Sequence, residues 1–272
     1  MSALEFGVFD GKAGSRVAGD VVYGHAPLGG QEVALHATLY LPKPGGRPPP
    51  LLVWIHGGGF RDGSHDQLQI RRLARQLTIE GFALATPEYR LGAEAADLSA
   101  ATRARLTVLE NVPVAGEPWM AGAAAIAAAE DVAVFLNWLE GVRAELGFAG
   151  RPVLGGSGAG AVTAFNAAYL APVLGLQRPE PGGILSYSGG FAWPELYEPG
   201  KYPVFALHNP FDEVLGIASV RALSQRDPEM ELIEAWEQEH GLLRVHPQET
   251  KPTTFGRIRG MLEAWAAGPG AA

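Results

Sequence analysis

The chain has 272 residues, with 21 Lys and Arg against 29 Asp and Glu, so its formal net charge is −8 at pH 7. Because 47% of the residues are hydrophobic and only 18% are charged, a disordered chain is excluded and a sizeable core is expected. The acidic balance argues against a nucleic-acid surface, which needs clustered Lys and Arg. The absence of cysteine excludes disulfides, thiolate metal sites and a cysteine nucleophile.

The sequence also carries no sign of a targeting or membrane segment. The first ten residues, MSALEFGVFD, contain neither a basic region nor an apolar stretch of the kind that secretory signals have. Even the Ala-rich stretch Ala121–Ala129 is far shorter than the roughly 18 apolar residues that a membrane span needs. We therefore expect a cytoplasmic protein without a membrane partner.

Short apolar runs of strand length recur along the chain. The alternation in Val33–Tyr40 predicts a strand with one covered face, and the continuous run Leu51–Ile55 predicts a strand buried on both faces. The intervening segment Pro42–Pro50 is predicted to be an exposed turn. Further strands are predicted, in chain order, at Phe82–Thr86, Pro152–Gly155, Ile184–Ser188, Pro203–His208 and Glu231–Trp236.

Helical patterns lie between these runs. Asp66–Glu80 has leucines at helical spacing and stops at Gly81, which is a helix C-cap signal. Other helices are predicted at Ala121–Gly147, Ala159–Ala171, Leu215–Gln225 and Thr253–Ala267. The alternation of strands and helices favours one α/β domain over residues 1–272, with a parallel sheet covered by helices on both faces. In residues 91–120 the apolar residues follow neither the helical nor the strand periodicity, so we expect a partly helical lid or insertion there.

A run of glycines follows the strand Leu51–Ile55 directly, in the segment His56–Phe60 (HGGGF). Glycine has no Cβ and accepts positive φ, so such a turn can bring its backbone close to a ligand. It can also aim two backbone N–H groups at one point, which is the arrangement that stabilises an oxyanion.

With this loop, the sequence resembles the α/β-hydrolases of the esterase and lipase group related to hormone-sensitive lipase, in which HGGG carries the oxyanion hole. The resemblance covers nearly the whole chain and includes PEYRL at 87–91, EDVAVFLNWL at 130–139, a glycine-rich elbow and HNPFD at 208–212. It implies an α/β-hydrolase fold with a mostly parallel sheet of the eight-stranded type and a small lid insertion. It also implies that Gly58, Gly59 and Ala159 donate the oxyanion hydrogen bonds.

The elbow of this group carries the nucleophile in the pattern G-x-S-x-G, and here the chain reads LGGSGAGA at 154–161. A register centred on Ser157 lacks the second flanking glycine. A register centred on Gly158 has both Gly156 and Gly160, and we favour it because the strained turn needs small neighbours. Gly158 then occupies the nucleophile position without a hydroxyl.

Three explanations of the missing hydroxyl remain open. The serine was replaced on purpose so that a ligand is held without turnover, or a natural member lost the chemistry, or Ser157 took over as nucleophile. In the last case the elbow has to be rebuilt, because adjacent residues of a sharp turn point in different directions.

The acid and the base are expected later in the chain, in the order Ser, Asp or Glu, His. Asp212 follows the predicted strand Pro203–His208, at the end of a strand where catalytic groups gather in open α/β sheets. It also fits the N-cap of the next helix, and Glu213 is the weaker candidate for the acid.

His240 lies 28 residues after Asp212, in a loop that resembles the family's GHG segment, and His246 is the alternative base. His56 is interpreted as a structural residue of the oxyanion loop, and the other histidines considered, His25, His36 and His65, as packed or solvent-facing. The sequence contains no HExxH pair or close His/Asp cluster, so neither a metal nor a cofactor is expected.

Five apolar side chains are predicted to line the pocket, although each also fits ordinary core packing: Phe60, Trp119, Phe191, Trp193 and Leu215. They suggest an apolar or aromatic acyl group. The prediction is a serine carboxylesterase-type hydrolase of small-molecule esters, or of small amides, that lacks its nucleophile. Two alternatives are a non-catalytic ligand-binding homologue and cofactor-free chemistry that uses His240 and Asp212 as a base.

Overall fold

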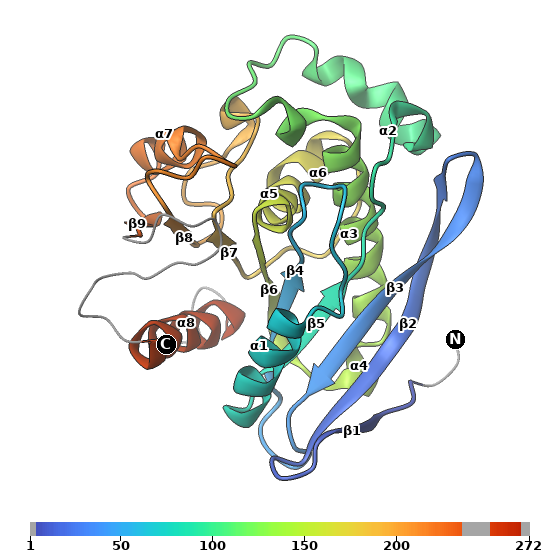
Figure 1. The fold of residues 1–272 in the computed structure, drawn as a ribbon, viewed down its shortest axis with the longest axis vertical. Helices are drawn as coiled ribbons and strands as arrows, with labels where there is room; N and C mark the ends of the chain where they lie inside the picture. Colours follow the sequence, from blue (N-terminus) through green and yellow to red (C-terminus); the bar gives the residue numbers. More distant parts are fainter. Residues whose placement is uncertain (1–3, 236–250, 268–272) are drawn as a thin grey trace.

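The computed structural model describes residues 4–235 and 251–267. Its centre is one mixed sheet of nine strands in the order β1-β2-β3-β5-β4-β6-β7-β8-β9 (Figure 1). The strands are β1 Gly7–Asp10, β2 Ser15–Leu28, β3 Gln31–Leu41, β4 Pro50–Ile55, β5 Ala83–Pro87, β6 Ala149–Ser157, β7 Gly183–Tyr187, β8 Val204–His208 and β9 Glu231–Glu234. The α/β architecture expected from the sequence is therefore confirmed, with one strand more than eight.

The sheet changes direction at β3. Strands β4 to β9 are paired in parallel, whereas β1, β2 and β3 form an antiparallel meander that joins the rest through the antiparallel pair β3–β5. Every strand expected from the sequence is present within a few residues of its predicted bounds. Strands β1 and β2 were not anticipated. In β2 the buried and exposed residues do not alternate regularly, and the register of β2 against β3 shifts twice. The alternation of apolar and polar residues that predicts a strand is therefore weak in this segment.

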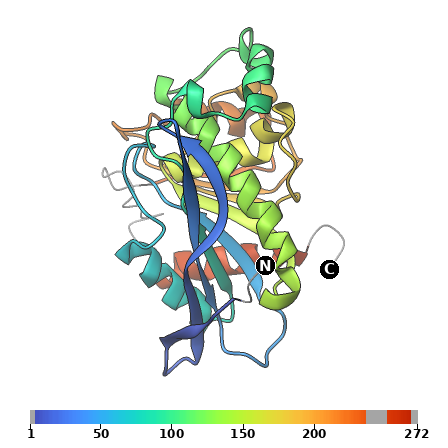
Figure 2. The ribbon, with the colours of Figure 1, turned by 90° about the vertical axis from the view of Figure 1, so that its right-hand side faces the viewer.

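Helices cover both faces of the sheet (Figure 2). They are α1 Leu68–Ile79, α2 Ala100–Arg105, α3 Ala123–Gly141, α4 Arg143–Leu146, α5 Ala159–Phe165, α6 Ala171–Val173, α7 Ala218–Arg226 and α8 Lys251–Ala267. One core cluster holds side chains of α3 and α5, and the second holds side chains of α1 and α8. The sheet is thus buried between two apolar layers, as its continuous apolar strands require.

Helix boundaries agree with the sequence signals where a glycine marks them. Helix α1 ends at Ile79, and Gly81 follows with φ +87°. The long Ala-rich stretch is divided into α3 and α4, and the helix predicted over Ala159–Ala171 continues from α5 through a π-helical turn into α6. Helix α7 begins at Ala218, three residues later than predicted.

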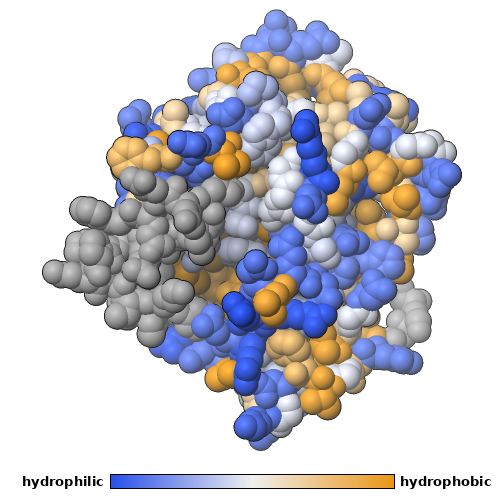
Figure 3. All heavy atoms as spheres, in the orientation of Figure 1, coloured by the Kyte–Doolittle hydropathy of each residue, from blue (hydrophilic) through white to orange (hydrophobic). Residues whose placement is uncertain are grey.

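The segment predicted as a lid, residues 91–120, contains α2 and short 3-10 turns between β5 and α3. It lies over the carboxyl ends of the parallel strands, at the top of Figure 1. Hydrophobic atoms gather on the surface in that region (Figure 3), where Val108 and Val114 are exposed. Its end is fixed to the domain, because Met120 is fully buried and the Ala115 amide donates to the Ala192 carbonyl oxygen at 2.8 Å.

A buried ionic cluster ties this segment to the hairpin β2–β3 and to α3. The Arg90 guanidinium contacts Asp131 at 2.8 Å and Glu130 at 2.8 Å, and it also donates to the carbonyl oxygens of Pro27 and Asp97. Arg90, Glu130 and Asp131 are all nearly inaccessible to solvent. Burial raises the pKa of Asp131 to about 6, in opposition to the neighbouring guanidinium. The conspicuous PEYRL and ED segments of the sequence therefore have a structural role.

Candidate active site

The sharp turn between β6 and α5 has Gly158 at its apex. Gly158 has φ 54° and ψ −119°, a backbone conformation that side-chain-bearing residues adopt only under strain. Its amide donates to the Tyr187 carbonyl oxygen of β7 at 2.9 Å, which holds the turn against the neighbouring strand. This is the strand–turn–helix geometry that a nucleophile elbow requires.

The two glycines that flank this apex are both sterically necessary. A Cβ on Gly160 would lie 2.0 Å from the Ile55 carbonyl oxygen, and a Cβ on Gly156 would lie 2.5 Å from the Gly160 carbonyl carbon. Both contacts are with backbone, which cannot move aside easily. Positions 156 and 160 therefore require glycine, and the assignment of position 158 as the nucleophile position stays a prediction.

Ser157 lies one residue before the apex, at the end of β6, where it pairs with Tyr187. Its backbone and hydroxyl lie against the glycine loop, because a Cβ on Gly57 would meet the Ser157 carbonyl oxygen at 2.8 Å and the Ser157 Oγ at 3.3 Å. The residue is partly exposed. Within residues 4–235 and 251–267, no hydrogen bond is recorded for its hydroxyl.

The glycine loop itself is a tight turn beside the elbow. Gly58 has φ +119° and Gly59 has φ +60°, and the Gly58 carbonyl oxygen accepts from the amides of Arg61 and Asp62 at 3.1 and 3.0 Å. Only glycine fits at position 58, where a Cβ would lie 1.9 Å from the Asp62 carbonyl oxygen. In the part of the chain that the structure describes, the amides of Gly58, Gly59 and Ala159 form no backbone hydrogen bond of the turns and loops. Their role as oxyanion donors stays a prediction.

His56 supports this loop, as interpreted from the sequence. Its Nδ1 lies 2.8 Å from the Gly57 carbonyl oxygen, and its ring stacks on Tyr89 with centroids 4.3 Å apart. Burial lowers the pKa of His56, so the ring is neutral at pH 7 and donates its Nδ1 proton to that carbonyl. Of the three other histidines in the amino-terminal half of the chain, His36 is paired with Asp20 and His65 with Glu88, while His25 is exposed.

Asp212 lies in the loop that follows β8 and is buried. Its Oδ1 accepts from the amides of Val214 and Leu215 at 2.9 and 3.0 Å, which closes a turn. It does not cap the following helix, because α7 begins at Ala218 with Ile217 as its N-cap. Glu213, the weaker candidate for the acid, is exposed to solvent.

His208 also belongs to this loop, and the sequence reasoning assigned it no role. Its Nε2 lies 2.8 Å from the Leu215 carbonyl oxygen and 3.9 Å from Asp212 Oδ2, and its Nδ1 lies 3.2 Å from the Gly189 carbonyl oxygen. The buried ring thus ties the Asp212 loop to the end of β7. The signal in the sequence was its i,i+4 spacing from Asp212 within HNPFD.

The candidate bases His240 and His246 lie outside the described residues. The base of the site therefore stays a prediction from the sequence. Among the described residues, no group of three or more His, Asp or Glu side chains is arranged to hold a metal ion. The helices in these same ranges are too short or too polar to cross a lipid bilayer.

Four of the five predicted pocket residues are core side chains: Phe60, Phe191, Trp193 and Leu215 are at most 2% exposed. Phe191 packs among Phe165, Tyr169 and Trp193 beneath α5. Trp119 keeps partial exposure and meets the ring of Phe60 edge-on at 5.7 Å. Contact of these side chains with substrate stays a prediction, and Trp119 is the one best placed to make it.

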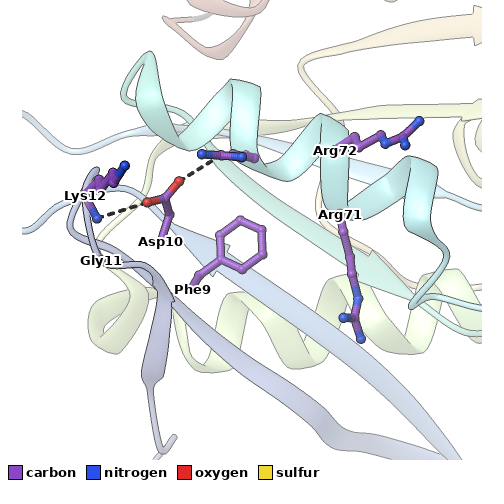
Figure 4. Close-up of a pocket in the computed structure, with 7 residues that line it drawn as sticks. Phe9, Asp10, Gly11, Lys12, Arg71 and Arg72 are labelled. Atoms are coloured by element: carbon purple, nitrogen blue, oxygen red, sulfur yellow. Dashed lines mark hydrogen bonds and ion pairs between the residues drawn. The ribbon is translucent and has the colours of Figure 1, made fainter.

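A cavity of about 630 Å³ opens elsewhere, between the β1–β2 turn and α1 (Figure 4). It is lined by Phe9, Asp10, Gly11, Lys12, Arg71, Arg72 and Arg75. Asp10 already pairs with Arg75 at 2.8 Å, and the side chains of Arg71 and Arg72 point in different directions. The cations therefore do not converge on a common ligand, and the cavity is separate from the elbow.

The chain has the α/β-hydrolase fold, and comparison with known proteins supports this. Residues 38–103 match the family model BD-FAE. No curated protein matches the sequence significantly. The similar solved structures include esterases. The native thermophilic esterase Est2 from Thermogutta terrifontis has a TM-score of 0.62 and 16% identity, with 94% of this chain and 95% of that chain covered.

Two further structures are similar. Brefeldin A esterase, a bacterial homologue of human hormone-sensitive lipase, has a TM-score of 0.60 and 16% identity, with 98% of this chain and 80% of that chain covered. Thermogutta terrifontis esterase 2 phosphorylated by paraoxon has a TM-score of 0.59 and 17% identity, with 92% of this chain and 91% of that chain covered. The expected fold is therefore confirmed.

Proposed function

We propose that this chain is a carboxylesterase-type hydrolase whose elbow carries no nucleophile. Esters of small or aromatic acyl groups bind between the glycine loop and the Asp212 loop, and no acyl-enzyme forms. The observation that carries the proposal is the positive-φ backbone of Gly158, which would strain a residue with a Cβ, between two glycines that tolerate no Cβ. The BD-FAE match and the esterases of the same fold support the substrate class.

In this proposal the remaining parts of the machinery keep their roles. The amides of Gly58, Gly59 and Ala159 hold the developing oxyanion, and each such donor contributes on the order of 3 kcal/mol in hydrolases of this kind. Asp212 orients the imidazole of His240, which acts as the base. Without a serine hydroxyl at position 158, only about 10³–10⁴-fold acceleration over water is expected from the rest of the site.

The experiment compares Gly158→Ser with Gly158→Ala, since both substitutions add a Cβ to the strained turn and only the first adds a hydroxyl. We expect Gly158→Ser to hydrolyse p-nitrophenyl acetate at least 100-fold faster than Gly158→Ala, because only the serine can form an acyl-enzyme. Paraoxon should phosphorylate Gly158→Ser alone, as intact-protein mass spectrometry will detect. His240→Ala in the Gly158→Ser background should abolish turnover.

Two outcomes contradict the proposal. If Gly158→Ser folds but neither turns over nor takes up the phosphoryl group, a ligand-binding homologue or base-only chemistry replaces it. If the unmodified chain is phosphorylated on Ser157, the elbow register is wrong and Ser157 is the nucleophile.

A further inference from the structure

The outer side of α1 carries a stripe of exposed apolar and cationic side chains. Leu68, Arg72, Arg75 and Ile79 follow one another at intervals of four, three and four residues, so they share one side of the helix. Leu68 and Ile79 are 60% and 58% exposed, and the helical rise places them about 16 Å apart. The core contacts of α1 are made by other residues, which are Ile70, Ala74, Leu77 and Thr78. The stripe is therefore not needed for packing within the domain.

The stripe borders the cavity between α1 and the β1–β2 turn (Figure 4). The residues that line this cavity include four cations and one carboxylate. Arg71 and Arg75 are each paired with an aspartate. For Lys12 and Arg72, no ion pair is recorded within residues 4–235 and 251–267. A surplus of positive charge thus remains at this place, on a chain whose net charge is −8.

The two walls of the cavity are held together by their own contacts. Asp10 Oδ2 of the turn pairs with Arg75 Nε of α1 at 2.8 Å, and Asp10 Oδ1 accepts from the Lys12 amide at 3.0 Å. The Phe9 ring packs against Tyr40 of β3, with the ring centroids 4.6 Å apart. Because a surface that is already ordered loses less conformational entropy on association, these contacts favour binding of a partner.

The size and the layout of the cavity discriminate between classes of partner. Its volume of about 630 Å³ is far more than one phosphate or carboxylate group fills, and it lies within the range of about 300–1,000 Å³ that is typical of ligand sites. Arg71 and Arg72 point in different directions, so the charges are spread along α1 and are not directed at one small ligand (Figure 4). An elongated partner with several carboxylates fits this layout.

The apolar side chains narrow the choice further. A nucleic-acid backbone carries charge but would leave Leu68 and Ile79 without an apolar contact, and the acidic chain as a whole repels it. A lipid surface is flat and would not enter the hollow beside α1. A closed symmetric dimer through this surface would bring the cations of both copies together.

We propose that the α1 face, defined as Leu68, Arg72, Arg75 and Ile79 together with Lys12, binds an acidic amphipathic helix of another protein. A helix antiparallel to α1 matches the stripe when it has apolar residues at positions i and i+11 and carboxylates at i+4 and i+7. The apolar residues then contact Ile79 and Leu68, and the carboxylates pair with Arg75 and Arg72. The proposal goes beyond the esterase function, because it uses none of the residues assigned to the active site.

The test titrates the full chain into a fluorescein-labelled helical peptide with Leu, Glu, Glu and Leu at positions i, i+4, i+7 and i+11 and measures fluorescence anisotropy. We expect a dissociation constant of about 100 μM or lower at about 50 mM NaCl. At about 500 mM NaCl binding should be at least about fivefold weaker, because exposed charges are screened. Peptides with Gln in place of Glu, or with Ser in place of Leu, should each bind about tenfold more weakly.

Charge variants of the chain locate the binding surface. The double variant Lys12→Gln, Arg72→Gln should bind the peptide about tenfold more weakly, because two contacts between charges are lost. The matched control is Arg105→Gln, Arg151→Gln, which removes the same net charge from two exposed positions outside the cavity lining. This control should bind like the parent. The melting temperature of each variant confirms that it is folded.

A second pair of variants tests the apolar contacts. Leu68→Ser, Ile79→Ser should weaken binding about tenfold, because apolar surface is no longer buried against the peptide. The control is Val108→Ser, Val114→Ser, since both valines are 52% exposed and belong to the segment over the strand ends. It should bind like the parent.

Several results would overturn the proposal, and none of them concerns the esterase function. They are absence of peptide binding at about 1 mM, and equal binding by the Lys12→Gln, Arg72→Gln variant and its control. Vesicles of phosphatidylserine and phosphatidylcholine that sediment the parent but not this variant would identify a lipid surface as the partner. A dimer of the parent that this variant loses in sedimentation velocity would identify a second copy of the chain.

Discussion

The substitution Gly158→Ala tests the elbow geometry through stability alone, without any substrate. At φ 54° and ψ −119° a residue with a Cβ is strained, and such conformations cost about 1–3 kcal/mol. Replacing glycine also stiffens the unfolded chain, which offsets about 0.4–1 kcal/mol of that cost. The free energy of unfolding should therefore fall by about 1–2 kcal/mol. At about 2–4 °C per kcal/mol for a domain of roughly this size, the melting temperature should fall by about 2–8 °C.

Differential scanning calorimetry and guanidinium unfolding of the parent and Gly158→Ala measure this difference. Gly158→Ser should lose the same amount within about 0.5 kcal/mol, because it adds the same Cβ. Gly141→Ala is the control: Gly141 ends α3, is exposed, has no positive φ, and would place its Cβ in open space. It should raise stability by about 0.5–1 kcal/mol.

A Gly158→Ala protein as stable as its parent would refute the reasoning. The residue would then lack the strained backbone that marks the apex of the elbow, and the choice between positions 157 and 158 would be open again. A loss much greater than 3 kcal/mol would show instead that the Cβ meets a steric clash in addition to backbone strain.

Two further predictions concern buried and half-buried charges. Arg90→Leu leaves the carboxylates of Glu130 and Asp131 buried without their cation and should lower the free energy of unfolding by about 3–5 kcal/mol. Removal of the exposed Arg259–Glu80 pair by Arg259→Leu should cost less than about 1 kcal/mol, when both variants are compared with the parent by urea titration. Equal losses would contradict the role of the cluster. The His65 hydrogen bond lowers the pKa of Glu88 from 4.5, so its stabilisation is present above that pH and is lost as the pH falls through the lowered value. The parent should therefore lose stability below about pH 4.5 more steeply than Glu88→Gln, and parallel stability curves would contradict the pairing.

The local patterns in the sequence were sufficient to predict the parallel strands of the sheet and the helices that cover them. Continuous apolar runs such as Leu51–Ile55 can be buried on both faces only in a sheet covered by helices, and β4 lies in such a position. The glycines of the loop and the elbow were also informative, because a requirement for positive φ or close backbone approach leaves few other residues possible. By contrast, β1 and β2 were not predicted, since the antiparallel meander is partly exposed and irregular in register.

Only the tertiary structure decided which glycines are indispensable and where the aromatic side chains lie. The contact of Gly160 with Ile55 joins segments that are about a hundred residues apart, so no local pattern could have ranked position 158 above 157 with certainty. Phe191 and Trp193 are in loops by sequence, yet they pack into the core beneath α5, because neighbouring elements rather than local polarity determine burial. The sequence by itself determined the chemical types present at the site. The packing of β4, β6, β7 and β8 decided which of them meet, since side chains distant in the chain converge only where strand ends are brought together.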